Sequence, residues 1–164
     1  MMKKTTRSRM DDKGFTLVEM IVVLVIIAVL ASAIVPSLTG YINRANKEKA
    51  VSETRSLVMA AQTVISDAYA NGSLDAILEQ EAPGDTEAIA EIRELAGFPQ
   101  GEQDNTRYFV ATVSGTGEIV KLEYLYADEE ACVYDGQNAT YSAGVAPSDD
   151  MDAGTDAILA AEAG

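Results

Sequence analysis

The sequence contains no histidine and only one cysteine, Cys132, among its 164 residues. Without histidine the chain can build neither a Ser-His-Asp nor a Cys-His catalytic site, and it lacks a usual ligand of zinc. One cysteine cannot form a disulfide within the chain, so the fold must hold without covalent cross-links. Cys132 stands between apolar residues, which predicts a small buried side chain. No pair of carboxylates stands out as an acid/base couple. We therefore predict a protein that is not an enzyme and that binds no cofactor or metal.

Basic residues are scarce beyond the N-terminal segment. Residues 1–14 carry five basic and two acidic groups, a net charge of +3, whereas the other 150 residues carry seven basic and 24 acidic groups, a net charge of −17. Such an acidic chain repels phosphate, so we expect no direct binding of nucleic acid. A basic end that precedes an apolar run stays in the cytoplasm, which places the acidic remainder outside the membrane.

The apolar run from Phe15 to Val35 contains a single charged residue, Glu19. At about 21 residues, the run is long enough to cross a bilayer as a helix. A carboxylate inside a spanning segment costs on the order of 3 kcal/mol, so it needs a partner or a purpose. Extension of the Glu19 side chain to the cytoplasmic headgroups is one explanation, but it leaves the neighbouring residues unexplained.

Residues 13–20, KGFTLVEM, stand where the polar segment meets the apolar run. Together with the Ile/Val/Leu/Ala run and Pro36, they resemble the N-terminal segment of type IV pilins and pseudopilins. The resemblance implies that a membrane prepilin peptidase cleaves the chain between Gly14 and Phe15, and that the new Phe15 amine is then N-methylated. It also implies that Glu19 of one subunit meets the Phe15 amine of a neighbour during assembly.

Elementary electrostatics favours the same role for Glu19. After cleavage, the Phe15 amine and the Glu19 carboxylate form an i, i+4 pair on one face of the first helical turn. The positive end of the helix dipole stabilises a carboxylate there by about 0.3–1 kcal/mol. In a helix bundle of low dielectric constant an unpaired charge is strongly unfavourable. Only an axial offset between neighbouring helices that pairs Glu19 with an amine is therefore stable.

An ordinary secretory signal peptide is the alternative interpretation of this segment, with Ala31-Ser32-Ala33 as its cleavage site. Glu19 lies where such a signal has its apolar core, and the helical pattern continues past Ala33 without a break. The mature N-terminus separates the two hypotheses: Phe15 supports assembly, and a start after Ala33 supports a secreted protein.

One long helix is predicted from Phe15 to about Ala70. Its first half is wholly apolar, and we expect a kink near Val35 because Pro36 removes a backbone hydrogen bond. From Tyr41 onward the pattern is amphipathic, and Asn71-Gly72 ends it. The residues expected to be buried recur at spacings of three and four: Leu57, Val58, Ala61, Val64, Ile65 and Ala68.

The rest of the chain reads as two short helices followed by strands. The helices are predicted at Ser73–Gln80 and Thr86–Ala96, and a polar loop at Gln100–Asn105. Thr106–Val113 and Glu118–Tyr126 predict a hairpin with one buried face, on which Val120, Leu122, Tyr124 and Tyr126 lie, with Lys121 and Glu123 on the other. Ala131–Tyr134 and Ala139–Ser142 predict two further strands.

These elements predict an α+β fold, in which the long N-terminal helix packs its amphipathic half on a small antiparallel β-sheet, as in pilins. We expect a cleaved leader at 1–14, a transmembrane and assembly half at 15–38, a globular region at 39–146 and an acidic, mobile tail at 147–164 with one or two helical turns at Asp156–Glu162. Four aspartates of this tail suggest calcium, but their spacing fits no defined loop: Asp149, Asp150, Asp152 and Asp156.

The resulting hypothesis is a structural subunit of a type IV pilus or pseudopilus filament that serves adhesion, motility, secretion or DNA uptake. The resemblance implies as partners identical and related pilin subunits, the prepilin peptidase, a membrane assembly platform and, before assembly, membrane lipid. The subunit would span the cytoplasmic membrane once, with its globular region outside, and then enter an extracellular filament. The alternative is a minor or tip pilin that acts as a membrane-tethered binding module.

Overall fold

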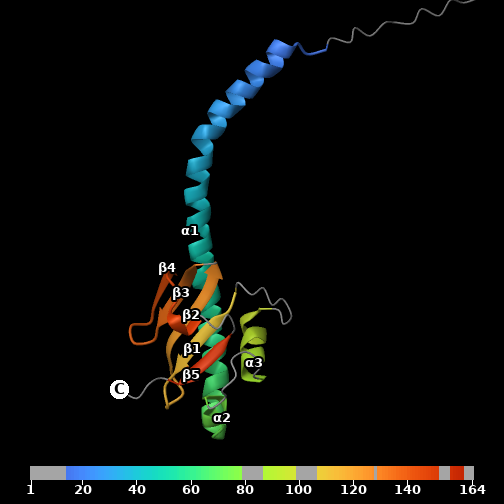
Figure 1. Ribbon diagram of the computed structural model, residues 1–164. Helices are drawn as coiled ribbons and strands as arrows, with labels where there is room; N and C mark the ends of the chain where they lie inside the picture. Colours follow the sequence, from blue (N-terminus) through green and yellow to red (C-terminus); the bar gives the residue numbers. More distant parts are fainter. Residues whose placement is uncertain (1–13, 79–86, 99–106, 128, 152–155, 161–164) are drawn as a thin grey trace, which may run out of the picture. The chain divides into compact units, whose positions relative to one another are not determined.

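The computed structural model describes residues 14–78, 87–98, 107–127, 129–151 and 156–160 (Figure 1). The chain divides into two compact units, Met1–Ile42 and Asn43–Gly164, and we call the second unit the head. The helix α1, Leu17–Asn71, belongs to both units and is unbroken. The predicted long helix is thus confirmed, with a start two residues later than expected. The domain boundaries predicted from the sequence stay predictions.

The head continues after α1 with two helices, five strands and one 3₁₀ turn among its described residues. In chain order these are α2 (Leu74–Leu78), α3 (Glu87–Ala96), β1 (Phe109–Val113), β2 (Ile119–Ala127), β3 (Glu130–Asp135), β4 (Thr140–Val145), η1 (Asp149–Met151) and β5 (Ala157–Ala160). The two predicted short helices and four predicted strands are confirmed; α3 and β1 end at the predicted residues, Ala96 and Val113, and the other bounds differ by a few residues. The leader before Gly14 and the loop 100–105 lie outside the described residues.

Local sequence explains why the helices end where they do. Gly72 has a φ of 70°, and the Ser73 amide donates to the Ala68 carbonyl at 2.9 Å, which closes the last turn of α1. Gly97 has a φ of 80°, and the Phe98 amide donates to the Arg93 carbonyl at 2.8 Å, which closes α3 in the same way. Glycine adopts this left-handed conformation at little cost, so both helices stop at a glycine.

The five strands form one sheet in the order β4-β3-β2-β1-β5. The β1–β2, β2–β3 and β3–β4 pairs are antiparallel, and the β1–β5 pair is parallel. Figure 1 shows the sheet beside the part of α1 that belongs to the head. In this view β4 and α3 lie on opposite sides of α1. The fold is therefore the predicted α+β arrangement of a long N-terminal helix on a mostly antiparallel sheet.

The main core lies between α1, α3 and one face of the sheet. The predicted apolar face of α1 is buried, and Leu57 is only 1% exposed. It packs with Ile92 of α3, which is 0% exposed, and with Tyr124 of β2, which is 1% exposed. The apolar side chains that recur with the helical period in α1 and those on one side of β2 thus pack together in a single core.

The opposite face of the β1–β2 hairpin also carries buried side chains, contrary to the predicted hairpin with a single buried face. Val110 and Leu125 pack there with Met151 of η1, which is 1% exposed. Glu123 is 4% exposed, and its carboxylate accepts a hydrogen bond from the Ser148 hydroxyl. The prediction was wrong because the segment from Ser148 to Met151 covers this face, which strand alternation alone cannot reveal.

The C-terminal prediction was also wrong in its secondary structure. Residues 157–160, expected in a helical turn of a mobile tail, form the edge strand β5 and pair with Val110–Val113 of β1. The segment Ala-Ile-Leu-Ala has too few residues to favour a helix by itself. The open backbone edge of β1 supplies hydrogen bonds that a free helical turn lacks, so the parallel strand is the favoured state.

Candidate functional site

The predicted cleavage site lies just before the first turn of α1. Gly14 and Phe15 have no regular secondary structure and both are exposed, Phe15 by 74%. The helix begins at Leu17 because Thr16 caps it: the Thr16 Oγ1 atom accepts a hydrogen bond from the Glu19 amide at 3.2 Å. A Cβ atom added to Gly14 would meet nothing within 4 Å. The Gly14–Phe15 peptide bond therefore stands outside the helix in open surroundings.

Glu19 lies in the first turn of α1 and is exposed. No ion pair among the described residues includes it. In the uncleaved chain the nitrogen of Phe15 belongs to a neutral peptide bond, so it cannot balance the carboxylate. Within the described residues, the positive end of the helix dipole favours a carboxylate at this position. The described part of the chain therefore offers the Glu19 carboxylate no cationic partner.

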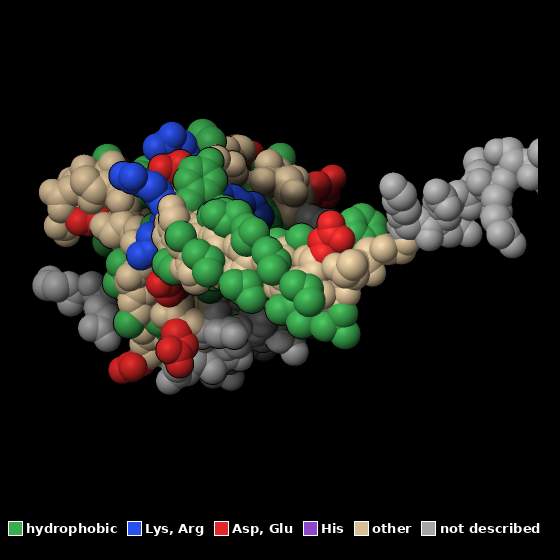
Figure 2. Space-filling model, turned by 90° about the horizontal axis from the view of Figure 1, so that it is seen from above, with side chains coloured by type: hydrophobic (Ala, Val, Ile, Leu, Met, Phe, Trp, Pro, Cys, Tyr) green, Lys and Arg blue, Asp and Glu red, His purple; other side chains and the backbone are tan. Residues whose placement is uncertain are grey.

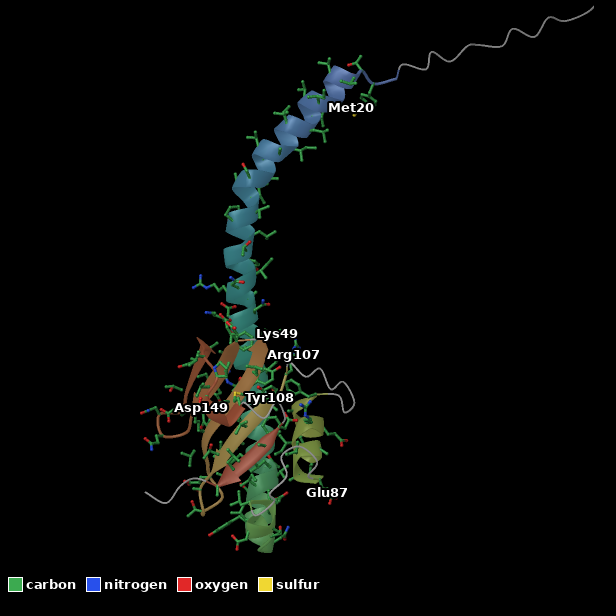
Figure 3. The ribbon with its side chains drawn as sticks, in the orientation of Figure 1. Met20, Lys49, Glu87, Arg107, Tyr108 and Asp149 are labelled. Carbon is green, nitrogen blue, oxygen red and sulfur yellow. The ribbon has the colours of Figure 1, made fainter. Side chains whose placement is uncertain are left out.

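The large apolar side chains in the portion of α1 that follows Glu19 are exposed (Figure 3, where Met20 is labelled), and Figure 2 shows apolar side chains on one face of the molecule. None of the residues of its most apolar 18-residue window is buried, and the helix is long and apolar enough to cross a membrane. A helix of a soluble fold does not leave such a long apolar surface bare, so this surface requires lipid or other helices around it.

Pro36 lies inside α1, which continues through it without a break. Proline has no N–H, so the Ser32 carbonyl one turn earlier lacks its usual donor. The nearby hydroxyls are bound to other carbonyls: Ser32 Oγ donates to Val29 O at 2.7 Å, and Thr39 Oγ1 to Val35 O at 3.1 Å. The kink at Pro36 stays a prediction.

The first turns of α1 within the head carry most of the basic groups that follow the leader. Four of the seven basic residues beyond position 14 fall between residues 44 and 55. Arg44 and Lys47 line a groove of about 570 Å³, which we call the basic groove; its full lining is Asn43, Arg44, Lys47, Glu48, Val51 and Ala143. Blue side chains gather in one part of Figure 2, whereas red ones are spread over the view.

A smaller pocket of about 290 Å³ lies beside this groove, where Lys49 and Arg107 meet (Figure 3). The Lys49 ammonium lies 3.3 Å from Oε1 of Glu53, and the other carboxylate oxygen, Oε2, accepts a hydrogen bond from the Tyr124 hydroxyl at 3.2 Å. Burial, and then the charge of Glu53, raise the pKa of Tyr124 far above its ordinary value. The phenol therefore stays a neutral donor that ties α1 to β2.

Sequence reasoning missed the contacts that fasten the C-terminal segment. Asp156 is 7% exposed; it pairs with the Arg93 guanidinium of α3 and accepts a hydrogen bond from the Phe109 amide at 2.8 Å. The Tyr108 hydroxyl donates to the Met151 carbonyl. Asp156 therefore forms an ion pair, and no group of three or more His, Cys, Asp or Glu in the described part of the chain could hold a metal. Asp152 of the four predicted aspartates lies outside the described residues.

Comparisons with known proteins find the same N-terminal segment. Residues 9–35 match the family model of the prokaryotic N-terminal methylation motif. Type II secretion system core protein G of Escherichia coli K12 is 53% identical over 47 residues, 29% of this chain and 32% of that protein. The type IV major fimbrial protein FimA of Dichelobacter nodosus is 38% identical over 56 residues, 34% of this chain and 36% of that protein.

A third relative extends the similarity into the head. The fimbrial protein of Pseudomonas aeruginosa is 31% identical over 120 residues, 67% of this chain and 74% of that protein. The match to the secretion relatives spans only about a third of their length, 32% for the Escherichia coli protein. No solved structure matches the chain significantly. With its methylation motif, its exposed apolar helix and its similarity to a fimbrial protein over most of both chains, this chain belongs to the type IV pilin and pseudopilin family.

Proposed function

We propose that this protein is the structural subunit of a type IV pilus or pseudopilus filament, assembled through α1 after cleavage between Gly14 and Phe15. The observation that carries the proposal is the apolar surface of α1 before the head, which nothing in the described chain covers. Before assembly, lipid covers this surface. In the filament, the same surface packs against identical helices.

The hydrophobic effect contributes little to the movement of α1 from the bilayer into the filament. Lipid tails are as apolar as leucine, so helices that leave a bilayer for a bundle gain mainly packing contacts and polar pairs. One buried ion pair therefore has a large share in choosing the arrangement. The Glu19 carboxylate of one copy and the Phe15 amine of its neighbour would form that pair, because an unpaired charge in the bundle costs several kcal/mol.

The exposed Gly14–Phe15 segment before α1 supports a proposed processing route. A membrane peptidase would cut the open Gly14–Phe15 bond on the cytoplasmic side, N-methylation of Phe15 would follow, and a membrane assembly platform would collect the product. The net charge of +3 on residues 1–14 and of −17 on the remainder supports a cytoplasmic leader and an external head. The finished filament would stand at the cell surface or in the envelope.

Mass spectrometry of the mature N-terminus tests the proposal. In cells that contain the peptidase, we expect wild-type chains to begin at an N-methylated Phe15, and Gly14→Ala chains to reach the membrane uncut. Gly40→Ala is the matched control, since Gly40 also has open space around it and lies far from the cleavage site. Wild-type chains that retain residues 1–14 in their native setting would refute the proposal, because the Phe15 amine would then not exist.

A further inference from the structure

The outer face of α3 carries an acidic ridge, formed by Glu87, Glu91 and Glu94. Their spacings of four and three residues place these carboxylates on one face of the helix, and all three are exposed. No ion pair among the described residues includes any of them. Leu95, 55% exposed, stands beside Glu94 and one turn after Glu91. The ridge thus combines negative charge with one bare apolar side chain.

The ridge is held firmly in place by the opposite face of α3. Ile89 and Ile92 are 4% and 0% exposed in the main core. Arg93 is bound to Asp156 of the C-terminal segment. A helix fixed by core packing and by an ion pair presents its outer side chains with little loss of freedom on binding, which favours a docking surface.

The basic groove has the complementary chemistry. Arg44 and Lys47 supply positive charge at its rim, and Val51 and Ala143 supply an apolar floor. Gly144, with a φ of 80°, leaves room for the Lys47 side chain over β4, since a Cβ atom there would collide with the Lys47 ammonium. The groove can therefore receive an apolar side chain flanked by carboxylates.

The cations of the groove are only loosely engaged within their own chain. Arg44 lies 3.9 Å from Glu48, and both side chains are more than three-quarters exposed. Lys47 lies 4.0 Å from Glu130, at the limit of an ion pair. Exposed pairs of this kind contribute little to stability, so both cations can turn to another carboxylate at small cost.

We propose that the acidic ridge of one copy docks into the basic groove of the next copy, with Leu95 over Val51 and Ala143 and with the ridge carboxylates against Arg44 and Lys47. The two surfaces lie on different sides of the head, since α3 and β4 are on opposite sides of α1 in Figure 1. A contact between two different surfaces of identical copies is heterologous, and it propagates as an open helical filament when its rotation does not close into a ring. The inference rests on the proposed filament function and names a contact through which the heads associate.

Charge reversal on each surface tests the contact. We expect the groove variant R44E/K47E and the ridge variant E91K/E94K each to lower the yield of sheared filaments by about tenfold or more, since attractive pairs become repulsive. The control D67K/D75K changes two exposed acids on other surfaces and alters the net charge by the same amount as the ridge variant. Its yield should match that of the wild type.

Two combinations of the groove and ridge substitutions then show whether the lower filament yield comes from loss of the contact between heads. The fourfold variant, with both surfaces reversed, should recover filaments. Co-expression of the groove variant with the ridge variant should also recover them, as an alternating copolymer, because each acidic groove then faces a basic ridge and each basic groove an acidic ridge. Neither rescue is possible if Arg44 and Lys47 serve lipid headgroups, since a lipid cannot change its charge.

Each variant is first checked for cleavage at Phe15 and for a wild-type thermal transition of its tyrosine signal. If a reversal disturbs the head, the neutral variants E91Q and E94Q, which keep the side-chain size, should still lower the yield several-fold. Wild-type yield from the single-surface variants, or loss without rescue in both combinations, would overturn the docking contact alone. Absence of filaments from the wild type would instead refute the proposed function.

Discussion

The buried Asp156–Arg93 pair should hold the C-terminal segment to the rest of the head, and its removal should be costly. Asp156→Ala leaves the Arg93 guanidinium without its anion and the Phe109 amide without its acceptor; Arg93 is only 22% exposed and Asp156 only 7%. Loss of one partner of a buried ion pair costs about 3–5 kcal/mol. Because Arg93 can still reach water and the Arg107 carbonyl, we expect a loss near the lower limit, about 3 kcal/mol.

Urea unfolding of the full chain in detergent measures this loss. The chain has no tryptophan, and six of its seven tyrosines follow residue 68, so tyrosine fluorescence reports on the head and not on the apolar part of α1. With a denaturant slope of about 2 kcal/mol per molar urea, a loss of about 3 kcal/mol lowers the midpoint by about 1.5 M. Asp149→Ala, which removes an exposed acid of η1, should leave the midpoint unchanged.

A double-mutant cycle shows whether the pair itself is responsible. Arg93→Ala leaves the Asp156 carboxylate, the more deeply buried of the two charges, without its cation. It should therefore destabilise the head at least as much as Asp156→Ala. The double variant should cost less than the two single losses added together, by about 1–3 kcal/mol, because the second substitution removes a charge that is already unpaired. Additive losses, or a midpoint for Asp156→Ala equal to that of Asp149→Ala, would refute the reasoning.

Two further predictions concern the N-terminal charge and a tight turn. Glu19→Val should be cleaved and methylated normally yet give few filaments, as measured by the sheared-filament yield against total processed subunit; wild-type yield would remove Glu19 from the assembly mechanism. Gly136→Ala should lower the stability of the head by about 1–3 kcal/mol in the same urea assay, because the new Cβ would overlap the Ile119 carbonyl oxygen and approach that of Val120 to 2.9 Å. Gly115→Ala, in a turn with nothing within 4 Å, is its control and should be nearly neutral.

Much of the helical part of this fold could be predicted because its signals are local. The apolar positions of α1 in the head recur with the helical period, and all six residues expected to be buried are buried. Gly72 and Gly97 end their helices in the way that their sequence context predicts. The start at Leu17 differs by two residues from the expected one because the Thr16 hydroxyl caps the helix, a detail that the apolar pattern does not carry.

The errors concern residues whose surroundings come from distant parts of the chain. Glu123 was expected with Lys121 on the face of the hairpin that is not buried, but it is buried, and its carboxylate accepts a hydrogen bond from Ser148, 25 positions away. Asp156 reads as one more acid of a solvated tail, but Arg93, 63 positions earlier, gives it a buried site. No window of sequence contains both members of either pair, so periodicity and propensity had no means to predict them.

The sequence by itself determined that one end of this protein is basic, that an apolar segment with a single acid follows it, and that the segment continues as an amphipathic helix. These properties depend on neighbours within a turn or two along the chain. The tertiary structure alone decided which surfaces the head presents: it placed the edge strand β5, buried side chains on both faces of the β1–β2 hairpin, and set an acidic ridge and a basic groove on different sides of the head. Those features arise from contacts across long loops, whose geometry is fixed only when the whole core packs.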